Sequence, residues 1–141
     1  MKKVLLILVV VISIILSGCA GTATPPSDSQ ATAEASAEYR KITAEQAKEK
    51  MSETDDWILL DVRTEEEFEE ERIEGAILIP DYEISGRVES EISDKDAVIL
   101  VYCRSGRRSA NAAHEMAEMG YTNVYDFGGI IDWPYDTVSG E

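Results

Sequence analysis

The chain has 141 residues, of which 28 are acidic and 13 basic, so its formal net charge is −15. Because nucleic-acid binding depends on cations that neutralise phosphates, this charge argues against nucleic acid as a partner. One histidine and two cysteines cannot assemble the usual zinc clusters, so no metal site is expected. The length suits about one domain.

The amino-terminal stretch MKKVLLILVVVISIILSGC has the layout of a secretory signal. Two lysines precede an apolar run over residues 4–16, and small residues follow before Cys19. The run is shorter than the roughly 20 residues that a membrane-spanning helix needs. An ordinary signal peptide with a cysteine there by chance, or an uncleaved anchor, is the alternative to the interpretation that follows.

The end of this signal, Leu-Ser-Gly-Cys, resembles the lipobox of bacterial lipoproteins. The resemblance implies a signal peptide over residues 1–18, cleavage before Cys19 and a lipid on that cysteine. Lipidation would anchor the protein to a membrane of the bacterial cell envelope, outside the cytoplasm. Residues 20–38 are small and polar, which predicts a flexible tether. We therefore divide the chain into the signal, a lipidated tether over 19–38 and a folded domain over 39–141.

Within the predicted domain, short apolar runs alternate with helix-forming segments. Runs that predict strands lie at 57–62, 75–80, 97–102 and 123–127, and residues 39–42 suit a fifth short strand. The wholly apolar run at 57–62 is typical of a strand buried on both faces of a parallel sheet.

The helices are predicted between these strands. Thr43 with Gln46, and Thr64 with Glu67, have the spacing of capping boxes that open helices. Residues 81–92 and 107–120 are also expected to be helical, with Gly120 ending the second of them. The alternation of strands and helices indicates an α/β domain with a mainly parallel sheet.

The stretch VYCRSGRRSA places Cys103 at the end of the most hydrophobic predicted strand. Ligands of open α/β sheets bind at the carboxyl ends of the strands. If Cys19 carries a lipid, Cys103 has no cysteine of its own chain to pair with, and an unpaired thiol in an exported protein indicates either intermolecular pairing or a reactive residue. An inert, buried cysteine is the alternative.

The residues after Cys103 favour an anion. They lead into the start of a helix, where unpaired N–H groups and the helix dipole attract negative charge. Small residues would let this backbone approach a ligand closely, and arginines add positive charge: Ser105, Gly106 and Ser109, and Arg104, Arg107 and Arg108. Together these features favour the nucleophilic thiolate over the thiol.

The motif CRSGRRS, with LLDVRTEEEFEEERIEGAILIP upstream and NVYDFGGIIDW downstream, resembles a single-domain rhodanese, a rhodanese-like sulfurtransferase. The resemblance covers about residues 39–135. It implies a five-stranded, mainly parallel sheet with helices on both faces. It also implies that Cys103 carries a sulfane sulfur as a persulfide, with no other cofactor.

The resemblance assigns roles to further residues. Residues 104–108 would cradle the persulfide, with Arg108 closing the loop. The supporting residues would be Asp61 and Arg63 below the site, the pair Glu67 and Phe68, and the closing motif of Gly128, Gly129 and Trp133. For Asp61, Arg63 and Trp133 a purely structural role is an equal alternative. Arg72 and Glu74 depart from the histidine and proline that are usual in the family.

The implied reaction has two steps. The Cys103 thiolate takes sulfur from thiosulfate or a similar small anionic donor, and a thiol or cyanide then accepts it. One alternative is a cysteine phosphatase or arsenate reductase, but those enzymes use Cys-x5-Arg, whereas Arg108 gives Cys-x4-Arg here. The other alternative is a non-catalytic rhodanese-like binding or regulatory module.

Overall fold

The computed structural model of the protein describes residues 38–140. The predicted signal peptide, Cys19 and nearly all of the predicted tether lie outside these residues. No helix within 38–140 is long and apolar enough to cross a membrane.

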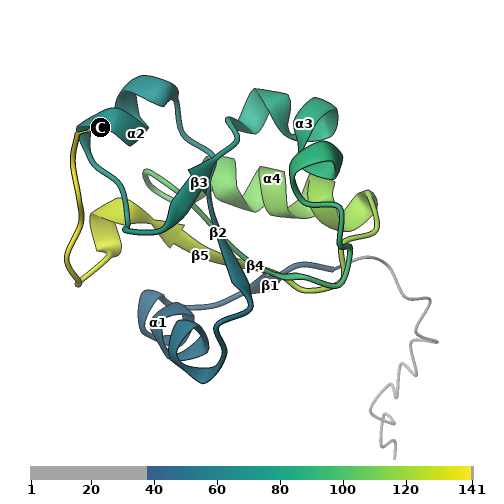
Figure 1. Cartoon of the computed structure of the whole chain (residues 1–141), viewed down its shortest axis with the longest axis horizontal. Helices are drawn as coiled ribbons and strands as arrows, with labels where there is room; N and C mark the ends of the chain where they lie inside the picture. The colour runs from purple at the N-terminus through teal and green to yellow at the C-terminus, as the bar shows by residue number, and fades with distance from the viewer. Residues whose placement is uncertain (1–37, 141) are drawn as a thin grey trace, which may run out of the picture. The chain divides into compact units, whose positions relative to one another are not determined.

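Five parallel strands form one sheet in the order β1-β5-β4-β2-β3 (Figure 1). The strands are β1 (Arg40–Lys41), β2 (Trp57–Asp61), β3 (Ala76–Leu78), β4 (Val98–Cys103) and β5 (Val124–Gly129). This confirms the predicted α/β class with a five-stranded parallel sheet. β3 is shorter than predicted, because Gly75 lies in the turn before it (φ +84°) and the chain enters a 3₁₀ turn at Asp81 soon after it.

Residues 38–140 also form four α-helices and two short 3₁₀ turns, of which the second follows the last strand. They are α1 (Ala44–Glu53), α2 (Glu65–Glu70), η1 (Asp81–Glu83), α3 (Ile84–Glu91), α4 (Arg107–Glu118) and η2 (Ile130–Asp132). Both predicted capping boxes are present, at Thr43 and Thr64. The single helix predicted over 81–92 begins instead as a 3₁₀ turn, in which the Glu83 N–H donates to the Pro80 carbonyl oxygen three residues earlier, at 2.8 Å.

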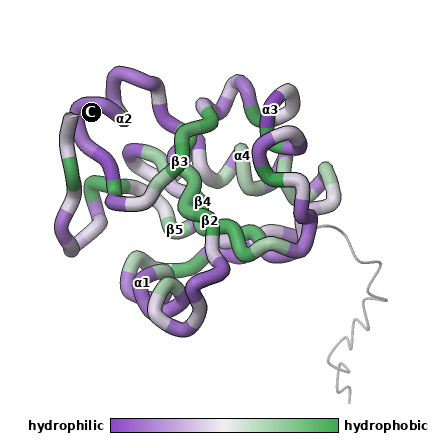
Figure 2. The backbone as a smooth tube through the Cα atoms, in the orientation of Figure 1, coloured by the Kyte–Doolittle hydropathy of each residue, from purple (hydrophilic) through white to green (hydrophobic). Residues whose placement is uncertain are grey.

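The helices cover both faces of the sheet. α1 lies on one face, and α3 and α4 lie on the other (Figure 1). Side chains of β4 alternate between the two cores: Val101 and Cys103 face α3 and α4, whereas Leu100 and Tyr102 face α1. This burial on both faces explains the uninterrupted apolar runs of the central strands, which are green in Figure 2.

Because the strands are parallel, their carboxyl ends meet at one edge of the sheet. Cys103 ends β4 in the middle of this edge, between Asp61 of β2 and Gly129 of β5. Each connecting helix begins beyond one of these strand ends, so the fold brings residues distant in sequence to the cysteine.

Candidate active site

Cys103 lies at the bottom of a tight loop. Its side chain is buried, with 1% of its surface exposed, and its Sγ accepts a hydrogen bond from the Gly106 backbone N–H at 3.1 Å. Gly106 has a φ of +97° and precedes the first residue of α4. This left-handed conformation, which favours glycine, turns the loop backbone toward the sulfur.

The end of β5 packs directly against the loop that follows Cys103. Cys103 pairs with Gly129 across the sheet, after an irregularity in the register. A Cβ at Gly129 would lie only 2.2 Å from the Arg104 carbonyl oxygen. The Ser109 hydroxyl is 3.1 Å from the Gly106 carbonyl oxygen and 3.2 Å from that of Gly128. The glycines of the closing motif thus allow the loop to lie directly against β5.

Asp126 is a buried residue in β5 that the sequence analysis did not single out. It is fully buried, and its Oδ1 accepts a hydrogen bond from the Gly128 N–H at 3.0 Å. Its Oδ2 has no hydrogen-bond partner among residues 38–140. The carboxylate thus holds the irregular end of β5 that leads into Gly129. The sequence signal that could have identified Asp126 is an acidic residue inside the predicted strand NVYDF.

The environment of Cys103 favours the thiolate. Burial raises the pKa of the thiol, but hydrogen bonds from Ser109 and from the Gly106 and Ser105 N–H groups outweigh it, so the pKa is lowered. The dominant stabilising groups are therefore the loop backbone and one hydroxyl. Arg108 also interacts electrostatically with Cys103. The predicted effect of the arginines is thus secondary to that of the loop.

Replacing Ser109 with alanine should raise the pKa of Cys103, because both the thiolate and the loop lose a hydroxyl donor. The wild-type thiolate persists below the usual thiol pKa of about 8.5 and is lost as pH falls through the lowered value. Alkylation by iodoacetamide, measured across pH, should therefore shift its midpoint upward in Ser109→Ala and slow severalfold at neutral pH. Ser90→Ala, on the exposed face of α3, is the control. An unchanged midpoint would contradict this assignment.

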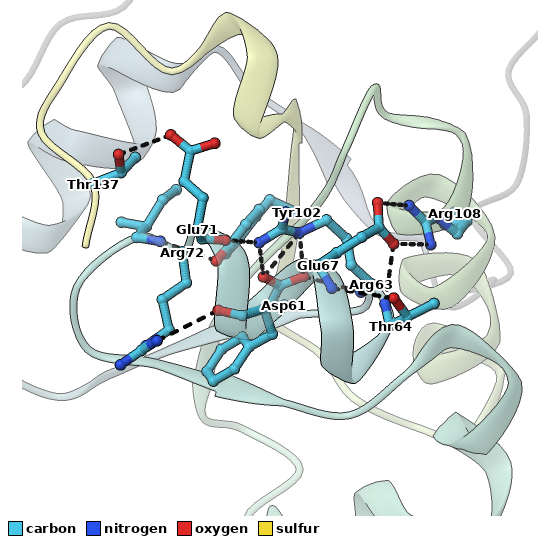
Figure 3. Close-up of polar contacts among 11 residues, drawn as sticks. Asp61, Arg63, Thr64, Glu67, Glu71, Arg72, Tyr102, Arg108 and Thr137 are labelled. Carbon is cyan, nitrogen blue, oxygen red and sulfur yellow. Dashed lines mark hydrogen bonds and ion pairs between the residues drawn. The ribbon is translucent and has the colours of Figure 1, made fainter. Parts of the chain in front are cut away.

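The three arginines of the loop have different surroundings. Arg108 forms a bidentate ion pair with Glu67 of α2, in which Nη1 and Nη2 donate to Oε2 and Oε1 at 2.7 and 2.8 Å respectively (Figure 3). Hydrogen bonding to Arg108 lowers the pKa of Glu67 to about 2, and the Thr64 N–H adds to the effect. Arg104 and Arg107 are exposed, and neither side chain has an ion-pair partner within the described part of the chain. Arg108 therefore joins α4 to α2, while the other two cations face solvent.

Asp61 and Arg63 form a buried ion pair beside the loop (Figure 3). The Arg63 Nη2 lies 2.7 Å from the Asp61 Oδ2 and also donates to the Glu71 carbonyl oxygen. The guanidinium carbon lies 5.6 Å from the ring centre of Tyr102. The Tyr102 hydroxyl, whose pKa is raised by burial, accepts from the Ile73 N–H at 3.2 Å. The pair thus ties β2 to the segment after α2, which is a structural role.

A cleft with a volume of about 540 Å³ opens next to the loop. Arg104 and Arg63 line it together with Glu67, Ile130 and residues 137–139. Among the predicted site residues, Arg63, Glu67 and Arg104 line this cleft, whereas Cys103 itself does not. Phe68 packs under the guanidinium of Arg72, and Trp133 packs against Phe127 in the core on the α1 side. No group of three potential metal ligands occurs in residues 38–140.

The comparisons with known proteins agree with this architecture. The Rhodanese-like domain family matches residues 43–134. Thiosulfate sulfurtransferase PspE of Escherichia coli K12 is 40% identical over 84 residues, which cover 60% of this chain and 79% of that protein. A sulfurtransferase of Allochromatium vinosum is 37% identical over 94 residues, covering 66% and 86%.

A solved structure, described as a rhodanese with anions from E. coli, superposes with a TM-score of 0.56 at 38% identity. The match covers 59% of this chain and 98% of that structure. The family match extends from the start of α1 to just after η2 and includes the loop of Cys103. The chain therefore belongs to the rhodanese-like domain family, with named sulfurtransferases among its relatives.

Proposed function

We propose that this protein is a sulfurtransferase that moves a sulfane sulfur through a persulfide on Cys103. The donor would be thiosulfate or a similar small anion, and the acceptor a thiol or cyanide. One observation carries the proposal: a buried thiol with a lowered pKa, held by loop N–H groups at the end of the central strand. The names of two relatives at 37 and 40% identity support the reaction class.

In the first step the Cys103 thiolate attacks the outer sulfur of thiosulfate. The sulfur–sulfur bond of the donor breaks, its electron pair leaves on sulfite, and a persulfide forms on Cys103. The N–H groups of Ser105 and Gly106, which lower the thiol pKa, would also stabilise the negative charge of this persulfide. Exposed Arg104 and Arg107 would attract the anionic donor to a chain that is otherwise acidic.

In the second step an acceptor thiolate, or cyanide, attacks the outer sulfur of the persulfide. The bond to the Cys103 sulfur breaks, its electron pair returns to Cys103, and the acceptor leaves as a persulfide or as thiocyanate. Because the enzyme alternates between two covalent forms, the kinetics should be ping-pong. No cofactor other than this covalent sulfur is required.

Changing Cys103 to serine should abolish the reaction. Intact-protein mass spectrometry after incubation with thiosulfate should show one added sulfur atom in the wild type and none in Cys103→Ser. Thiocyanate formation with cyanide should fall to the uncatalysed rate in the variant. Turnover that survives the change would refute the proposal.

The Cys103→Ser variant, used in a partner-binding test and a phosphatase assay, separates the two alternatives. A rhodanese-like binding module would give no persulfide, yet would retain a stable protein partner after Cys103→Ser. A phosphatase would hydrolyse an aryl phosphate in a Cys103-dependent way. The Cys-x4-Arg spacing, with Arg108 already paired to Glu67, argues against phosphate chemistry.

We also propose that Cys19 carries a lipid and holds the domain outside the cytoplasm, at a membrane of the bacterial envelope. The lipobox-like sequence before Cys19 supports this proposal. Metabolic labelling with palmitate should mark the wild-type protein, and Cys19→Ser should lose both the label and membrane sedimentation. Labelling of Cys19→Ser at the wild-type level would contradict lipidation.

A further inference from the structure

The end of the described chain forms a strap, which we define as residues 137–140. It pairs antiparallel with the segment after α2, because Arg72 and Val138 exchange two backbone hydrogen bonds of 2.8 Å. The Gly140 N–H donates to the Glu69 carbonyl oxygen at 3.0 Å. The strap begins after residue 134, where the family match ends. It therefore lies outside the matched residues and is fixed to them by backbone hydrogen bonds.

The strap forms part of the wall of the cleft, which adjoins the Cys103 loop at Arg104. Thr137, Val138 and Ser139 line the cleft together with residues that belong to the matched domain. The Thr137 hydroxyl donates to the Glu71 Oε1 at 2.9 Å (Figure 3). The strap thereby holds the side chain of an exposed glutamate in place at the cleft wall.

The charges of the cleft fall into two groups. Glu67 and Arg63 are neutralised, by Arg108 and Asp61 respectively. The remaining charges that line the cleft are those of Arg104, Glu70 and Glu71, and none of them has an ion-pair partner within residues 38–140. The charged side chains of the cleft that lack an ion-pair partner within residues 38–140 are thus one cation, Arg104, and two carboxylates, Glu70 at the end of α2 and Glu71 directly after it.

We propose, on the basis of the sulfurtransferase function above, that this cleft binds the sulfur acceptor and selects a small zwitterionic thiol. A carboxylate on the acceptor would pair with Arg104, and its ammonium group would pair with Glu70 and Glu71. A purely anionic thiol meets repulsion from the glutamates, and a purely cationic thiol meets repulsion from Arg104. The volume of about 540 Å³ and the strap wall suit a small molecule.

The test uses the full-length chain in detergent. Cys103 is loaded with thiosulfate, excess donor is removed, and the added sulfur atom is verified by mass before the acceptor is added. Single-turnover discharge is then measured with L-cysteine, with N-acetyl-L-cysteine, which lacks the ammonium group, and with cysteamine, which lacks the carboxylate. Rates are compared at equal thiolate concentration. Failure to load refutes the sulfurtransferase function itself, whereas the discharge rates test only the acceptor.

We expect L-cysteine to discharge the persulfide about fivefold to tenfold faster than either analogue, as one charge-assisted contact in a partly exposed cleft would give. The double variant Glu70→Gln with Glu71→Gln should remove the preference over N-acetyl-L-cysteine but keep the preference over cysteamine. Arg104→Gln should do the reverse. Thr137→Val should weaken the first preference, because Glu71 loses the hydroxyl that positions it.

Glu69→Gln is the matched control, since Glu69 precedes Glu70 in α2 but lines a different pocket. It should change neither preference, and its backbone contact with the strap is retained. Equal rates for the three thiols on loaded protein would overturn the proposal. So would preferences that survive the Glu70 and Glu71 changes, or a faster discharge by reduced thioredoxin than by L-cysteine at equal thiolate concentration.

Discussion

Replacing Gly129 with alanine is expected to abolish sulfur transfer, because the added methyl group would collide with the loop that holds Cys103. The new Cβ would lie 2.2 Å from the Arg104 carbonyl oxygen and 2.6 Å from the Ser105 Cα. Both atoms belong to the backbone, so the contact can be relieved only by moving the loop. That movement would separate the Gly106 N–H from the sulfur that it contacts at 3.1 Å.

A displacement of about 1 Å at a reacting centre can cost roughly 100-fold in rate, and we expect at least about that loss of thiocyanate formation in Gly129→Ala. The free energy of unfolding should fall by about 1–3 kcal/mol, the usual cost of overpacking. Persulfide loading by mass spectrometry and urea denaturation measure the two effects separately.

Gly86→Ala is the control for this substitution. Gly86 lies within α3, and the methyl group that alanine adds would meet no atom of another element of residues 38–140 within 4 Å. Alanine there should leave turnover unchanged and stabilise the helix by about 0.5–1 kcal/mol. Near-normal loading and turnover in Gly129→Ala would show that the loop tolerates a shift. That result would contradict the claim that a side chain at position 129 displaces the Cys103 loop.

Local signals in the sequence predicted most of the fold. The capping boxes at Thr43 and Thr64 depend on residues three apart, so both helix starts could be placed from the sequence alone. The buried strands were also predictable, because burial on both faces requires an uninterrupted apolar run. Cys103 at the end of such a run, before a helix start, then indicated the candidate site.

The surroundings of that thiol depend on contacts between distant segments, which no local pattern contains. Glu67 and Arg108 are 41 positions apart, so their ion pair follows from the fold alone. This pair engages one of the three arginines of the loop. The same holds for the strap, whose Thr137 is 66 positions from Glu71. Asp126 was missed for another reason. Its hydrogen bond is local, but the sequence does not show whether an aspartate within a strand is exposed or buried, and its role depends on that burial.

Replacing Arg63 with methionine is expected to cost about 3–5 kcal/mol of stability, because it leaves the charge of Asp61 buried without a counter-ion. Asp61 is fully buried and Arg63 is 4% exposed, so solvent cannot replace the lost contact. The hydrogen bond from Arg63 to the Glu71 carbonyl oxygen is lost as well. Urea denaturation, with the midpoint and slope analysed together, measures the change.

Two further variants test the cause of that loss. Arg87→Met removes a cation that pairs with Glu83 and Glu91 on the exposed surface of α3, and it should cost far less. Combining Arg63→Met with Asp61→Asn removes the buried charge together with its partner, so the double variant should be more stable than Arg63→Met alone. A double variant no more stable than Arg63→Met would assign the loss to packing and to the Glu71 contact. Recovery in the double variant would establish that the loss in Arg63→Met comes from the Asp61 charge, which cannot stay buried without a counter-ion.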